Sequence, residues 1–281
     1  MNQMPKRYYA FFTLPTLVAF VIAFLIPFLL GIYLSFTRFT TVTDSRWVGL
    51  SNYVRAFTGD AHFLDATIFT AKFAVISVIT INLLAFSLAF VLTRHLKGTN
   101  LFRTVFFMPN LIGGIILGYI WQLLINGILV NFGVDITFSA NYGFWGLVVL
   151  MNWQMAGYMM LIYIAAIQGI SHELVEAAKI DGADGWQVLR NITLPLCMPA
   201  FTICTFLTVS NSFKLFDQNL ALTAGAPGRD SAMLALDIFY TFYGGTNTEG
   251  IGQAKAVMFF ILVGLLVLVQ LRLTRTREVE N

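Results

Sequence analysis

Six long apolar segments constrain the fold more than any other feature of this sequence. They cover residues 11–36, 69–92, 105–125, 144–168, 196–216 and 254–273. A helix that crosses a bilayer needs about 20 mostly apolar residues, so each segment is long enough to span one. The sequence therefore predicts an all-α polytopic membrane protein with six transmembrane helices, and we assign residues 1–281 to a single transmembrane domain.

The composition agrees with a membrane protein and argues against other classes. Hydrophobic residues make up 58% of the chain and charged residues 11%, whereas soluble domains are about 25% charged. The 27 Phe, 10 Tyr and 5 Trp exclude a disordered chain. The net charge of +3 is spread along the chain in small clusters, so we expect no nucleic-acid partner.

The lysines and arginines between the apolar segments predict the orientation, because cytoplasmic loops carry more of them than external loops. Ten of the 17 fall in the termini and the connectors on one side. The opposite side holds five, or seven if Lys72 and Lys255, which lie near span ends, extend toward it. Those five are Arg38, Arg46, Arg55, Lys214 and Arg229. We therefore expect both termini in the cytoplasm.

The connector 169–195, on the predicted cytoplasmic side, is the most informative stretch of the chain. Ser171 can cap a short helix, and Gly182 permits a break after it. Asp184, followed by Gln187 three residues later, is typical of a capping box at the start of a second helix. The pattern predicts two short helices at the membrane surface, which either dock on another protein or form an amphipathic loop with no partner.

The same connector carries a motif with a long and specific spacing. It consists of Glu176-Ala177-Ala178, Gly182 and Ile192-x-Leu194-Pro195. This pattern resembles the EAA loop of permease subunits in binding-protein-dependent ABC importers. Other segments resemble the carbohydrate branch of that family, in particular the first permease of maltose-type systems. They are Leu14-Pro15, Tyr33 to Thr37, Trp47 to Tyr53, Phe102 to Pro109, Gly118 to Trp121 and Leu222-Thr223-x-Gly225-x-Pro227.

The resemblance implies an ABC type I importer permease fold in the bacterial cytoplasmic membrane, and a set of partners. These are a second permease that completes a heterodimer, two cytoplasmic ATPase subunits, an extracytoplasmic solute-binding protein and a sugar. In the family the EAA helix docks in a cleft of the ATPase, which makes Glu176 the expected charged anchor and Gly182 the hinge. The full ATPase-coupling set is Glu176, Ala177, Ala178, Asp181 and Gly182.

The sequence contains no G-x-x-x-x-G-K-[ST] phosphate-binding loop, so we expect ATP and Mg²⁺ to bind the partner ATPase. We expect this chain to be no enzyme, with no catalytic residue, no metal site and no cofactor of its own.

Polar residues inside the apolar segments are the candidates for the sugar site, because such groups usually face a bundle interior or a cavity. In maltose-type relatives the corresponding regions contact the sugar midway across the membrane. The candidates are Thr208, Asn211, Ser212 and Leu215, spaced for one face of the fifth span, with Asn152, Gln154 and Tyr158 on the fourth. The alternative is that these amides and hydroxyls only hold helices together.

Three other functions are weighed against the sugar importer. An ion-coupled secondary transporter commonly places ionisable residues in mid-membrane, and the centres of these spans have none. A membrane enzyme would need paired carboxylates or a nucleophile with a base, and no such set is evident. A glycerol-phosphate permease needs cations for the phosphate, and only Lys214 lies near the candidate site.

Overall fold

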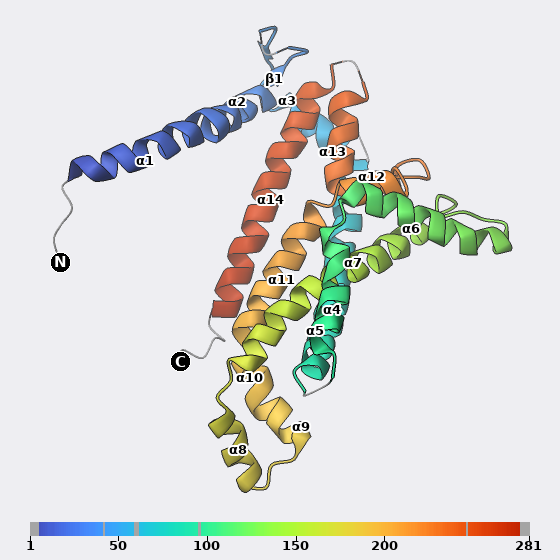
Figure 1. The fold of residues 1–281 in the computed structure, drawn as a ribbon. Coiled ribbons are helices and arrows are strands. Elements are labelled where there is room, and N and C mark those ends of the chain that lie inside the picture. Colours follow the sequence, from blue (N-terminus) through green and yellow to red (C-terminus); the bar gives the residue numbers. More distant parts are fainter. Residues whose placement is uncertain (1–5, 42, 59–61, 95–96, 246, 276–281) are drawn as a thin grey trace. The chain divides into compact units, whose positions relative to one another are not determined.

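The computed structural model describes residues 6–275, apart from residues 42, 59–61, 95–96 and 246, and these are almost entirely helical (Figure 1). The first elements are α1 Lys6–Phe20, η1 Val21–Leu25, α2 Ile26–Ser35, β1 Thr37–Arg38, β2 Arg46–Trp47, α3 Ser51–Thr58, α4 His62–Leu92, α5 Thr99–Phe107, η2 Met108–Leu111 and α6 Gly114–Leu129. The rest are η3 Val130–Phe132, α7 Ala140–Gln168, α8 His172–Ile180, α9 Gly185–Val188, η4 Leu189–Thr193, α10 Leu194–Leu196, α11 Met198–Phe213, α12 Asp217–Leu222, α13 Leu234–Tyr243 and α14 Glu249–Arg275.

The chain divides into two compact units. The first comprises Met1–Phe63 with Ile238–Ile261, and the second Leu64–Asp237 with Leu262–Asn281. In the first unit, the buried amide of Asn52 helps to join α3 to the preceding elements. Asn52 donates from Nδ2 to the carbonyl oxygens of Ser35 at 2.9 Å and Thr37 at 2.8 Å.

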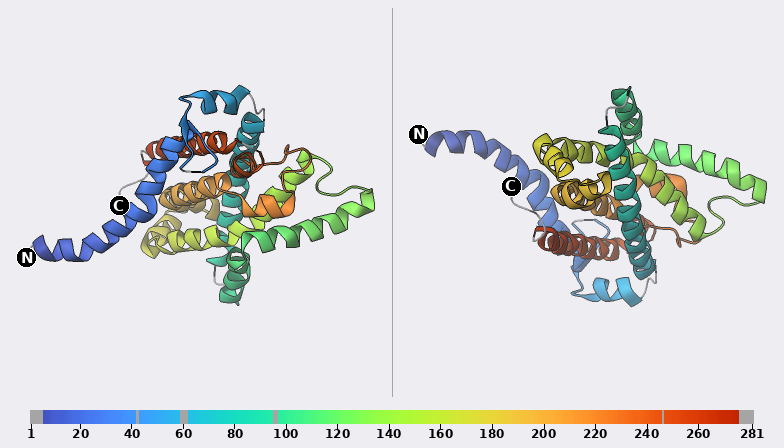
Figure 2. Two further views of the ribbon diagram at one scale, coloured as in Figure 1. Left: turned by 90° about the horizontal axis from the view of Figure 1, so that it is seen from above. Right: turned by 90° about the horizontal axis from the view of Figure 1, so that it is seen from below.

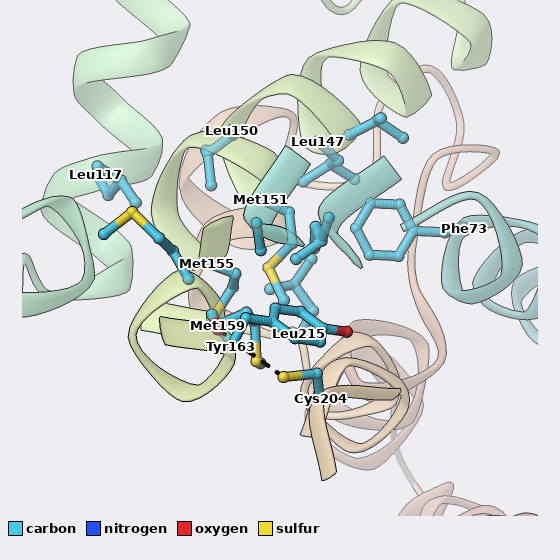
Figure 3. Close-up of a cluster of buried hydrophobic side chains, with 14 of the residues drawn as sticks. Phe73, Leu117, Leu147, Leu150, Met151, Met155, Met159, Tyr163, Cys204 and Leu215 are labelled. Atoms are coloured by element: carbon cyan, nitrogen blue, oxygen red, sulfur yellow. Dashed lines mark hydrogen bonds between the residues drawn. The ribbon is translucent and has the colours of Figure 1, made fainter. Parts of the chain in front are cut away.

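The core of the second unit forms around α7. Most of its apolar stretch is buried inside protein, whereas α4 and α6 bury a third or less of theirs. A helix that is apolar on all sides lies among other helices, and α7 fits that rule. Figure 3 shows its side chains meeting those of α4, α6 and α11. Those drawn include Phe73, Leu117, Leu147, Leu150, Met151, Met155, Met159, Tyr163 and Cys204.

Within the described residues, five helices are long and apolar enough to cross a membrane, or six if one bent pair counts as a span. The five are Phe11–Ser35, His62–Leu92, Gly114–Phe132, Ala140–Gln168 and Glu249–Gln270. The bent pair is Gly185–Leu196 with Met198–Phe213. The predicted all-α membrane fold is confirmed. The spans at 69–92, 144–168 and 254–273 begin several residues earlier than predicted, and the first, predicted at 11–36, ends at Ser35.

The predicted third span, 105–125, is wrong at its beginning. Residues up to Phe107 belong to α5, a short 3₁₀ turn follows, and a new helix begins only at Gly114. Pro109 has no N–H to donate, and Ile112 is extended at φ −84° and ψ 130°, so the first helix cannot continue. Hydrophobicity alone did not reveal this break, because the residues on both sides of it are apolar.

The predicted fifth span, 196–216, is also corrected. The chain bends by 63° between α10 and α11, and α11 ends at Phe213. Pro195 and Pro199 flank the bend at Cys197 and each removes a backbone donor. The straight part of this span therefore begins at Met198.

Helix α6 packs closely against the short helix α12 (Figure 2). A Cβ atom added to Gly118 would lie 2.6 Å from Cβ of Ala221, and one added to Gly114 would lie 2.8 Å from Cβ of Asp217. Gln122 adds a hydrogen bond from Nε2 to the carbonyl oxygen of Leu222 at 3.0 Å. Small residues that allow helices to approach closely are typical of membrane proteins.

This contact predicts that Gly118→Ala destabilises the protein. The added methyl group overpacks the contact with α12, at an expected cost of about 1–3 kcal/mol, visible as a lower thermal unfolding temperature in detergent. Gly127→Ala is the matched control on the same helix, since nothing lies within 4 Å of its added Cβ. Equal unfolding temperatures for the two variants would contradict the packing argument.

Candidate functional site

The connector between α7 and α11 folds as two short helices, as predicted. Gly182 separates α8 from α9 with φ at +88°, a conformation that favours glycine. Asp184 Oδ1 accepts a hydrogen bond from the backbone N–H of Gln187, while Gln187 Oε1 accepts one from that of Asp184, both at 2.7 Å. The predicted capping box is confirmed. Ser171 lies at the N-cap of α8, but its side chain makes no capping hydrogen bond.

The residues of this connector project away from the core of the second unit, and α8 has no buried residue. Glu176, Ala177, Asp181 and Gly182 are exposed, and Ala178 is half-buried. Two large apolar side chains are exposed beside them, Ile180 at 86% and Trp186 at 65%. Exposed apolar side chains that gather in one loop indicate a surface that binds another protein.

Two candidate sugar residues of α7 are buried in contacts with other helices. Asn152 donates from Nδ2 to Thr80 Oγ1 of α4 at 2.9 Å and to the carbonyl oxygen of Val148 at 2.8 Å. Gln154 Oε1 accepts a hydrogen bond from Gln218 Nε2 of α12 at 2.9 Å. Both amides therefore hold helices together in this structure. Asn152 also lines a cavity of about 500 Å³ between α4, η2 and α7, and its Oδ1 has no partner among the described residues.

Tyr158 lies beside the tightest helix contact of α7. A Cβ atom on the preceding Gly157 would lie 1.8 Å from the carbonyl oxygen of Phe106, so the end of α5 rests directly on the backbone of α7. The ring centroid of Phe107 lies 6.5 Å from that of Tyr158, which is half-buried. The position of the Tyr158 ring therefore depends on α5.

The four candidates of the fifth span do not share one surface. Thr208 and Ser212 are fully buried, and Thr208 Oγ1 donates to the carbonyl oxygen of Cys204 at 2.8 Å. Leu215 is buried beyond the last residue of α11, so the expected helical face ends at Ser212. Asn211 is exposed, with Nδ2 on the carbonyl oxygen of Leu207 at 2.8 Å. Its Oδ1 makes no hydrogen bond with another described residue.

Sequence reasoning missed Asn219, which fixes the segment before α13. Its Nδ2 donates to the carbonyl oxygen of Ser231 at 2.9 Å, and its Oδ1 accepts from the backbone N–H of Met233 at 2.8 Å. Asn219 is fully buried. A buried amide with all its bonds made is costly to replace. The signal in the sequence was an Asn at the end of the polar run Asp217-Gln218-Asn219, three residues before the Leu222-Thr223-x-Gly225 pattern begins.

The side chain of Lys255 does not take the outward orientation that its place near a span end would allow. It is instead fully buried in the first unit. Nζ donates to Thr241 Oγ1 at 2.7 Å and lies 5.4 Å from the ring centroid of Phe63. Burial of a lysine requires such partners, because an isolated charge is very costly in an apolar interior.

No group of three or more His, Cys, Asp or Glu side chains in the described part of the chain is placed to hold a metal ion. Taken together, the five or six apolar spans among the described residues and the exposed two-helix connector define a multi-pass membrane transport subunit. Residues 81–277 match the family model described as "Binding-protein-dependent transport system inner membrane component". The chain belongs to this family of inner-membrane permease subunits.

Similar proteins agree with this assignment over nearly the whole chain. A probable starch degradation products transport system permease, AmyD of Thermoanaerobacterium thermosulfurigenes, is 46% identical over 97% of this chain and 96% of its own. The trehalose/maltose transport system permease MalF of Thermococcus litoralis is 30% identical over 94% and 92%. The multiple sugar-binding transport system permease MsmF of Streptococcus mutans is 29% identical over 95% of each chain.

Solved structures confirm the fold. A chain of a bacterial ABC transporter that imports alginate superposes with a TM-score of 0.81 at 20% sequence identity, over 96% of both chains. The chain is thus an ABC importer permease by fold and family, and an ion-coupled secondary transporter is excluded.

The backbone at Gly182 predicts that Gly182→Ala loosens the two-helix connector. A left-handed conformation costs a residue with a Cβ about 1–2 kcal/mol, which corresponds to roughly tenfold faster hydrogen exchange of the α9 amides if they open locally. The measurement is hydrogen–deuterium exchange by mass spectrometry on the purified protein. Gly185→Ala is the control, because nothing lies within 4 Å of its added Cβ and its φ is not positive. Identical exchange in both variants would refute the argument.

Proposed function

We propose that this chain is a permease subunit of an ATP-driven importer that moves a sugar or oligosaccharide delivered by an extracytoplasmic solute-binding protein. The observation that carries the proposal is the 46% identity, over 97% of the chain, to a permease named for starch degradation products. The relatives named for maltose, trehalose and multiple sugars support the same class of cargo. Maltooligosaccharides, the sugars that starch yields, are the first cargo to test.

The proposed assembly contains a second permease subunit, which forms a heterodimer with this chain, and two cytoplasmic ATPase subunits. ATP and Mg²⁺ bind the ATPases, because this sequence contains no phosphate-binding loop of its own. The apolar surface that α4 and α6 leave exposed supports contacts with lipid and with the second permease. Both termini and the α8–α9 connector lie in the cytoplasm, in agreement with the distribution of lysines and arginines.

The α8–α9 connector couples ATP hydrolysis to transport. Glu176 is the charged anchor on the ATPase, and the exposed Ile180 and Trp186 contribute the apolar part of the contact. Ala177 and Ala178 keep the intervening face slim enough for close approach, with Asp181 at the C-cap of α8. Gly182 allows the sharp turn by which α9 leads back to the membrane.

The sugar passes between the two permeases and contacts polar groups of α7 and α11. Asn211 is the strongest candidate, because it is exposed and its Oδ1 makes no hydrogen bond with a described residue. Tyr158 offers an aromatic ring and a hydroxyl, a combination suited to the apolar face and the hydroxyl groups of a sugar. Asn152, Gln154, Thr208, Ser212 and Leu215 are buried in this structure, so they reach the sugar only when the helices move apart during transport.

Loss of the anchor tests the coupling role. Glu176→Ala is expected to lower the ATPase activity that the loaded binding protein stimulates by at least about tenfold, since a buried charge pair is strongly weakened by removal of one partner. Membrane insertion should be unchanged, because Glu176 is exposed in the isolated chain. The control is Glu173→Ala, another exposed carboxylate on the same helix. Normal transport by the Glu176 variant would contradict its docking role.

Loss of the amide tests the sugar site. Asn211→Ala should raise the KM for uptake of maltotriose into proteoliposomes by about twofold to tenfold, which corresponds to the roughly 0.5–1.5 kcal/mol of one hydrogen bond. ATPase activity without binding protein should stay as in the wild type. Asn131→Ala is the control, since Asn131 is an exposed amide bonded only to its own helix region. A KM unchanged in the Asn211 variant would remove this residue from the sugar path.

A further inference from the structure

The pair β1–β2 in the first unit places two arginines directly opposite each other. In this antiparallel pair Thr37 faces Trp47 and Arg38 faces Arg46. Successive side chains of a strand point to opposite faces, so the arginines lie on the face away from Trp47. That residue stacks on Phe36, with ring centroids 5.4 Å apart.

Two like charges opposite each other destabilise a strand pair, and arginine cannot relieve the repulsion by losing its proton. Arg38 Nε donates to Asn247 Oδ1 at 3.2 Å. The two terminal nitrogens of Arg38 take no part in that bond. Arg46 makes no ion pair among the residues that the structure describes. The arrangement is therefore costly for the isolated chain and suited to an anion that would bridge both guanidinium groups.

The two arginines line a cavity of about 300 Å³. Its lining consists of Arg38, Phe39, Thr40, Asp44, Arg46 and Asn247. Asp44 is the one acidic side chain of this lining, so the cavity keeps a net positive charge. A cavity of this size is at the lower limit of ligand sites, which fits one side chain better than an oligosaccharide.

We propose that Arg38 and Arg46, with Asn247, form a carboxylate pocket that receives an acidic side chain of the solute-binding protein. This inference rests on the proposed function and on the proposed orientation, in which β1 and β2 lie outside the cytoplasm. Arginine binds carboxylates through two parallel hydrogen bonds, which gives direction as well as strength. The pocket occurs on the side of the membrane that carries fewer lysines and arginines, which is consistent with a specific role there.

A charged contact also suits the binding protein, because it must associate with the permease and dissociate from it in every transport cycle. Charges at the edge of an interface speed association and select the partner, and they add less to final affinity than a buried apolar contact. Their effect is screened by salt, with a Debye length of about 8 Å at physiological ionic strength.

The test uses the complete assembly of permeases and ATPases in nanodiscs of zwitterionic lipid. ATPase activity is measured against the concentration of its binding protein loaded with maltotriose. The double variant R38Q/R46Q should need about tenfold more binding protein for half-maximal activity, with the same maximal rate. Its dependence on salt should be shallower than that of the wild type. R55Q is the matched control, because it neutralises another exposed arginine of the same unit that does not line the pocket.

Folding of the variant is followed by its thermal unfolding temperature. This temperature should stay equal or rise, because the substitution removes a pair of like charges. A lower unfolding temperature that accounts for the lost stimulation would overturn the proposal in favour of a structural role.

Three further outcomes distinguish the carboxylate pocket from a failure of the proposed function and from binding of lipid phosphates. A wild-type response in R38Q/R46Q would overturn the pocket and leave the proposed function standing. A wild-type assembly that the loaded binding protein fails to stimulate would overturn both. An effect of the substitutions that appears only in nanodiscs with anionic lipid would assign the arginines to lipid phosphates and overturn the carboxylate pocket.

Discussion

The interior of a bilayer offers no water to backbone N–H and C=O groups, and every part of this structure depends on that constraint. It explains why the apolar segments are helices, and also where helices can be interrupted. The break between α5 and α6 falls at Pro109, where η2 packs on α7. The bend before α11 falls between Pro195 and Pro199. Interruptions of this kind are tolerated where neighbouring helices cover the freed backbone groups.

The same constraint shapes the route by which an ATPase would move the permease. Without an apolar driving force between helices in lipid, close packing and hydrogen bonds hold them together. The end of α5 rests on the backbone of α7 at Gly157, next to Tyr158. From the exposed helix α8, the chain runs through Gly182, α9, η4 and α10 directly into α11, which carries Asn211. A displacement of α8 would therefore be transmitted along a short stretch of the chain to the proposed sugar site.

Much of this architecture could be predicted from the sequence because it depends on local chemistry. Apolar length predicted the spans, Asp184 and Gln187 predicted a cap, and Gly182 predicted a break. The start of the third span could not be predicted from apolar length, because residues before and after Pro109 are equally apolar. The burial of Lys255 depends on Thr241 and Phe63, which are distant in sequence. The bonds of Asn219 to residues 231 and 233 likewise become visible only in three dimensions.

The candidate sugar residues show the same limit more sharply. Spacing placed Thr208, Asn211 and Ser212 on one helix, and the structure agrees. Burial then separates them, because Asn211 is exposed while the other two are enclosed. The spacing of residues along a helix shows which of them share one face of that helix. It does not show which other helices cover that face, because this depends on tertiary packing.

In the proposed assembly, this chain moves a sugar only when a partner ATPase drives it through the α8–α9 connector. The most direct measurement is uptake of radiolabelled maltotriose into proteoliposomes that contain the full assembly, with the binding protein outside and ATP inside. We expect uptake that requires both ATP and binding protein and is lost in the Glu176→Ala variant. Uptake that persists without ATP, or that is unaffected by this substitution, would contradict this expectation.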